Sequence, residues 1–116
     1  MKLNTLLLGL IFSLFSMLAV AGSGHSHGHG HSHEPVNQST ANAKAAKIVK
    51  NFIKQNTIDK SWASASLSSS EKKLFNGKQE WVVTFDNNKM ADTKKRKLYI
   101  FLTLSGNYIA ANYTGK

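Results

Sequence analysis

The residues best suited to chemistry are five histidines at every second position of one short run, and the chain has no others: His25, His27, His29, His31 and His33. A neutral imidazole nitrogen is a good ligand for Zn²⁺, Cu²⁺ and Ni²⁺. In an extended chain, alternate side chains lie about 6.6–7 Å apart, too far for rigid neighbours to share an ion. The glycines and serines between them let the chain curl until several imidazoles converge. The run therefore predicts a site for Zn, Cu or Ni.

The run does not choose among these metals. Cu²⁺ binds most tightly by the usual divalent order, whichever ion is the biological one. Glu34 follows the run and could add an oxygen ligand, whereas thiolate ligands are excluded because the chain has no cysteine. Affinity should be modest and exchange fast, because the chain must lose conformational entropy to close around an ion. The alternative is a solvated linker whose histidines arose by repeat expansion.

The N-terminus has the anatomy of a secretory signal peptide over residues 1–21. Lys2 precedes an apolar run over residues 6–20, and Ala19-Val20-Ala21 is a small-x-small cleavage pattern. The apolar run is shorter than the ~20 residues that a membrane-spanning helix needs. We therefore expect cleavage near Ala21, a periplasmic or secreted protein, and no stable membrane anchor afterwards.

Export limits what the net charge of +9 can mean. Nucleic acid is not an expected partner outside the cytoplasm. Anionic lipid head groups and an acidic protein are the partners that a positive charge could still attract there. Residues 22–40 are polar apart from Val36, so we expect a flexible histidine-rich arm. Residues 41–116 should form one small domain, held by its core alone because no disulfide can form.

One amphipathic helix is predicted at the start of this domain, over residues 41–54. Ser39 or Thr40 can cap it, and Asn56 is a plausible stop. Its apolar residues recur at three- and four-residue spacing: Ala41, Ala45, Ile48, Val49, Phe52 and Ile53.

The rest of the domain has strand patterns. A weak alternation covers residues 58–67, and clearer aromatic and β-branched runs cover residues 80–85, 98–104 and 108–113. Trp62, Trp81 and Tyr99 are most simply residues of the core or of a sheet face.

Residues 68–75 allow two interpretations. Ser68 and Glu71 could form a capping box that opens a helical turn. The pair Asn76-Gly77 instead indicates a β-hairpin with Phe75 opposite Lys78 and Lys73 opposite Glu80, and we favour it. Short connections join antiparallel neighbours. The predicted fold class is therefore α+β, with one helix packed on a three- to four-stranded antiparallel sheet.

This order of elements resembles the PepSY-type domain. The strand EWVVTF and the ending LYIFLTLSGNYIAANYTG, with the histidine-rich N-terminus, also resemble small secreted bacterial proteins of uncharacterised function. PepSY domains are associated with inhibiting peptidases or modulating partners, so the resemblance implies a binding module and names no site residue. The histidine run departs from the general PepSY pattern.

We expect no enzyme. Every histidine lies in the arm, so none is positioned as a base for a serine nucleophile. Glu80 and Asp86 could share an acid–base role, although they read more simply as exposed carboxylates that offset Lys73 or Lys78.

A basic cluster, Lys94, Lys95, Arg96 and Lys97, precedes the strand at residues 98–104. Charges at a sheet edge deter strand addition, and docking to an acidic partner or membrane surface is the alternative. The sequence thus predicts an exported protein that buffers divalent metal ions or delivers them to a metal exporter or other envelope protein. The competing hypothesis is a PepSY-like partner-binding module in which the arm is incidental.

Overall fold

The computed structural model describes residues 34–116, and its first element is helix α2, Gln38–Lys54. The Asn37 side-chain oxygen accepts a hydrogen bond of 2.8 Å from the Thr40 backbone N–H, which satisfies a donor that has no partner within the helix. The predicted start at residue 41 and the predicted caps Ser39 and Thr40 were therefore wrong. Residues 38–40 belong to the helix and not to the arm.

The apolar face of α2 is buried as the spacing predicted. Ala41, Ala45, Val49 and Phe52 are buried, and the predicted residues Ile48 and Ile53 are half-buried at its margin. Beyond the helix, Asn56 adopts a left-handed backbone conformation with φ of 58°. Asparagine tolerates this conformation better than most residues, which explains why the chain turns there.

The segment after the helix is a 3₁₀ helix, η2, Lys60–Ser64, so the strand predicted over residues 58–67 was wrong except at Ser66 and Leu67, which begin the first strand. The Asp59 carboxylate accepts a hydrogen bond of 2.9 Å from the Ser61 backbone N–H and caps this turn. The turn buries Trp62, which is 1% exposed. The weak alternation of alanine and serine reflected a half-exposed turn and not a pleat.

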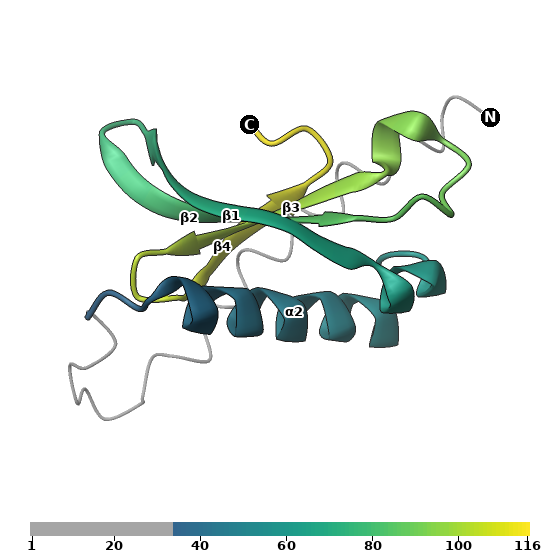
Figure 1. Cartoon of the computed structure of the whole chain (residues 1–116), viewed down its shortest axis with the longest axis horizontal. Helices are drawn as coiled ribbons and strands as arrows, with labels where there is room; N and C mark the ends of the chain where they lie inside the picture. Colours follow the sequence, from purple (N-terminus) through teal and green to yellow (C-terminus); the bar gives the residue numbers. More distant parts are fainter. Residues whose placement is uncertain (1–33) are drawn as a thin grey trace.

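Four antiparallel strands form one sheet in the order β1-β2-β3-β4. They are β1 (Ser66–Phe75), β2 (Lys78–Asp86), β3 (Lys97–Thr103) and β4 (Tyr108–Asn112). A short 3₁₀ helix, η3, Thr93–Lys95, lies between β2 and β3. Figure 1 shows α2 along one face of this twisted sheet, so the predicted α+β architecture is confirmed.

The β1–β2 hairpin has the predicted register. Phe75 pairs with Lys78 and Lys73 pairs with Glu80. Asn76 and Gly77 both have positive φ, 53° and 82°, as a two-residue turn with this twist requires. The capping-box interpretation of residues 68–75 was therefore wrong.

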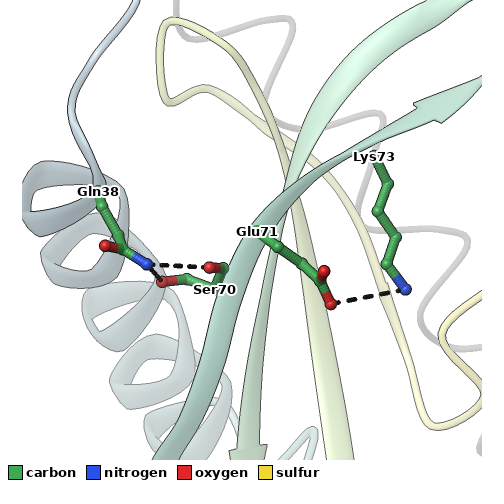
Figure 2. A network of polar contacts seen from close by, with 4 residues as sticks. All are labelled: Gln38, Ser70, Glu71 and Lys73. Carbon is green, nitrogen blue, oxygen red and sulfur yellow. Dashed lines mark hydrogen bonds and ion pairs between the residues drawn. The ribbon is translucent and has the colours of Figure 1, made fainter.

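The Gln38 side chain of α2 forms hydrogen bonds with the edge strand β1. The Gln38 amide nitrogen donates to the Ser70 backbone oxygen at 2.9 Å and to its hydroxyl at 2.8 Å (Figure 2). Lys73 lies 3.7 Å from Glu71 on its own strand, in an exposed pair of small energetic value.

Alternation divides the sheet residues between two faces. The core against α2 contains Trp81, Val83 and Phe85 from β2, and Leu98, Ile100 and Leu102 from β3. The opposite face carries Val82 and Phe101, which are also buried. Phe75 covers Phe101 edge-to-face with 5.5 Å between ring centroids, and the C-terminal segment lies on this side of the sheet (Figure 1).

Candidate functional site

The five predicted metal ligands, His25, His27, His29, His31 and His33, lie outside the described residues, as do the predicted signal peptide and its cleavage site. Glu34, the possible oxygen ligand next to them, is exposed. The following chain is attached to the domain at Val36, whose backbone N–H donates to the Leu104 oxygen at 2.8 Å. Val36 therefore lies beside the β3–β4 turn.

Residues 34–116 contain no group of three or more histidine, cysteine, aspartate or glutamate side chains that could hold a metal ion. In this part of the chain, no helix is both long and apolar enough to cross a membrane.

The four residues of the basic cluster differ in burial and in their partners. Lys95 is only 7% exposed, and its ammonium lies 5.9 Å from the centroid of the Tyr113 ring. Arg96 is half-buried, and its Nε donates to the Met90 backbone oxygen at 2.7 Å. Lys97 forms an ion pair of 2.9 Å with Asp86, and Lys94 is exposed. The cluster is therefore not one continuous exposed patch.

Three of these cations line one cleft of about 380 Å³, which we call the basic cleft. The lining residues come from β2, η3, β3, the loop between β2 and β3, and the C-terminal segment: Asp86, Asn88, Thr93, Lys94, Arg96, Lys97, Tyr99 and Tyr113. Lys95 is buried and is absent from this lining. Sequence reasoning found the cations and missed the residues that complete the cleft.

The connection between β2 and β3, which contributes to the cleft lining, is held by several hydrogen bonds. The Asn87 backbone N–H donates to the Arg96 oxygen at 2.8 Å, and the buried Asn87 amide nitrogen donates to the Ser61 hydroxyl at 2.8 Å. Asp92 caps η3 by accepting a hydrogen bond of 3.0 Å from the Lys94 backbone N–H. The positions of Asn87 and Asp92 are the sequence signals for this loop, since both residue types cap turns through their side chains.

The two carboxylates considered for acid–base chemistry are far apart. Glu80 and Asp86 lie six residues apart on β2, a separation of about 20 Å along an extended strand. Burial raises the pKa of Glu80, and the charge of Lys78 opposes this increase. Asp86 is paired with Lys97 and not with the predicted Lys73 or Lys78. The two groups cannot act on one substrate bond.

The three aromatic residues expected in the core or on a sheet face lie in two different places. Trp62 and Trp81 are buried in the core against α2, whereas Tyr99 lies in the wall of the basic cleft. Tyr113 forms another wall, and burial together with the negative charge of Asp59 raises its pKa to about 12. Its hydroxyl is therefore protonated at neutral pH.

Comparison with known proteins gave one result. Searches against curated proteins and solved structures found no match. A family of unknown function, DUF6488, matches residues 1–116. The family thus spans the N-terminal segment, the histidine run and the α+β domain together, and the chain belongs to DUF6488, a family of unknown function.

Proposed function

We propose that this protein is an exported, non-enzymatic metal-binding protein. It captures Zn²⁺, Cu²⁺ or Ni²⁺ through the histidine run and buffers the ion or delivers it to a metal exporter or other envelope protein. The observation that carries this proposal is the alternation of the five histidines, because imidazole is the common ligand of all three ions. The signal-peptide pattern ending at Ala21 supports a periplasmic or secreted location.

The α+β domain would provide stability and docking. Val36 is hydrogen-bonded to Leu104 at the β3–β4 turn, and Glu34, which follows the histidine run in the sequence, is exposed. The PepSY resemblance supports the docking role, because that association implies contact with a partner protein.

The direct test is an equilibrium titration of the mature chain with Zn²⁺, Cu²⁺ and Ni²⁺ near pH 7.5. The matched variant replaces all five histidines, from His25 to His33, by asparagine. We expect the parent chain to bind and the variant to lose most of this affinity. Binding should also weaken as pH falls through about 6.5, because protonated imidazole cannot ligate a metal. Equal affinity in both chains would contradict the proposal.

The competing partner-binding hypothesis is separated by a growth experiment. A strain producing the five-asparagine variant should show the phenotype of a null strain under metal excess if the run is the functional element. If the variant strain instead grew like the parent strain under metal excess, the domain would be the functional part and the histidines incidental.

A further inference from the structure

We propose that the basic cleft binds a compact oxyanion, a carboxylate or phosphate group carried by its ligand. This proposal concerns the domain and does not depend on the metal site. The first argument is charge: the lining contains the three cations Lys94, Arg96 and Lys97 and the single carboxylate of Asp86. The net charge of +9 adds a long-range attraction for anions.

The three cations are not equally available to a ligand. Asp86 already neutralises Lys97 at 2.9 Å. The Lys94 ammonium has no hydrogen-bond or ion-pair partner within residues 34–116. Arg96 uses its Nε on the Met90 oxygen, and its two terminal nitrogens have no partner among the described residues. Those two nitrogens match the paired oxygens of a carboxylate or phosphate.

The cleft is also held in shape before any ligand arrives. Arg96 is fixed through both its side chain and its backbone oxygen, by Met90 and Asn87. Asp92 fixes the backbone of Lys94. A group that is already oriented loses less conformational entropy on binding, so these contacts favour affinity.

The remaining lining supplies neutral donors and space. The Thr93 and Tyr99 side chains carry hydroxyl groups that can donate to an oxyanion. The volume of about 380 Å³ lies in the range of small-molecule sites and exceeds the needs of one anionic group. The cleft can therefore also accept a small organic body attached to that group.

The test is a ¹H–¹⁵N NMR titration of the mature chain with inorganic phosphate and, separately, with glutarate, at constant ionic strength balanced by chloride. We expect saturable shifts at Thr93, Lys94 and Tyr99. Shifts with phosphate alone identify a phosphate ligand, shifts with glutarate alone identify a carboxylate ligand, and shifts with both support the shared oxyanion chemistry. If neither probe gave saturable shifts up to about 50 mM, the proposal would be overturned. At that concentration even a site with a Kd of about 1 mM is nearly full.

Charge-matched variants separate the cleft from general attraction. Lys94→Gln should weaken binding about three- to fivefold, and Asp86→Asn should strengthen it by a similar factor because Lys97 is released. Lys47→Gln on α2 and Glu71→Gln on β1 make the same charge changes outside the cleft and should have little effect. Equal effects inside and outside the cleft would refute a specific site. The five-asparagine variant should bind both probes like the parent, which distinguishes this proposal from the metal proposal.

Discussion

Lys94 and Lys95 are neighbours in the chain, yet they have opposite environments. Lys94 is exposed in the wall of the basic cleft, whereas Lys95 is buried with its ammonium over the Tyr113 ring. A 3₁₀ turn of three residues per turn places consecutive side chains about 120° apart, so adjacent lysines face different surroundings. A basic run in sequence therefore does not specify a basic patch on the surface.

This difference predicts unequal effects of the same substitution. Lys95→Gln should lower the free energy of unfolding by about 1–2 kcal/mol, because it removes a desolvated cation–π contact and part of a buried aliphatic stem. Lys94→Gln should change it by less than about 0.5 kcal/mol, as is usual for an exposed residue. Urea unfolding of both variants measures the difference, and equal losses would contradict a stabilising role for the buried Lys95 side chain.

The raised pKa of Tyr108 predicts that the protein loses stability at alkaline pH. Burial raises its pKa from 10.0 to about 12, and its buried hydroxyl has no hydrogen-bond partner within residues 34–116. The folded state thus holds the proton more tightly than the unfolded state. The resulting stability is fully present below about pH 10 and is lost as pH rises toward 12.

Tyr108→Phe removes that hydroxyl while retaining the ring that contacts Phe52 edge-to-face at 6.0 Å. We expect its unfolding free energy at pH 7 to be equal to or up to about 1 kcal/mol above that of the parent. Its loss of stability between pH 10 and 12 should be smaller. Parallel slopes for the two proteins in denaturant titrations at several pH values would argue against Tyr108 as the source.

Among the elements, the buried strands could be predicted from the pattern of apolar residues, and the exposed strand could not. Strands β2 and β3 are buried, and their aromatic and β-branched runs made them recognisable. Strand β1 is almost entirely exposed and has no apolar periodicity, so only the Asn76-Gly77 turn indicated it. The 3₁₀ helix η2 was missed because it has a single buried side chain, Trp62, and one apolar position cannot show a periodicity. Asp59, which caps it, was the available signal.

The start of α2 provides a prediction that distinguishes the observed cap from the predicted ones. Asn37→Ala should lower the free energy of unfolding by about 1 kcal/mol, because the Thr40 backbone N–H loses its acceptor. Ser39→Ala, at a position within the helix, should be nearly neutral. Asn37→Asp is the control, since it keeps an oxygen acceptor and adds a favourable charge at the helix N-terminus. Urea unfolding should give a higher free energy of unfolding for Ser39→Ala than for Asn37→Ala. The reverse order would indicate that Ser39, and not Asn37, caps the helix.

For the molecule as a whole, the two candidate sites differ in how far sequence could predict them. The histidine run needs only five ligands within nine consecutive residues, so its chemistry can be proposed without a fold. The basic cleft combines residues 86–99 with Tyr113, and it exists only because the sheet brings the C-terminal segment beside η3. Such a site depends on tertiary contacts that no local pattern contains.

The same contrast predicts how metal binding affects folding. If the ligands come only from residues 25–33, the unfolded chain can offer them as well as the folded chain. A ligand that binds both states equally does not stabilise either one. We therefore expect Zn²⁺ at saturating concentration to change the Tm of the mature chain by less than about 1 °C, below the shift of about 4–8 °C that 1 kcal/mol of stabilisation produces in a domain of this size.

Differential scanning calorimetry with and without Zn²⁺, on the parent and the five-asparagine variant, measures this effect. A matching Tm in all four samples, together with metal binding by the parent alone, supports a histidine run that acts independently of the domain. A rise of several degrees in the parent would contradict this view. It would mean that a group fixed by the fold, such as the exposed Glu34 next to the anchored Val36, completes the metal site.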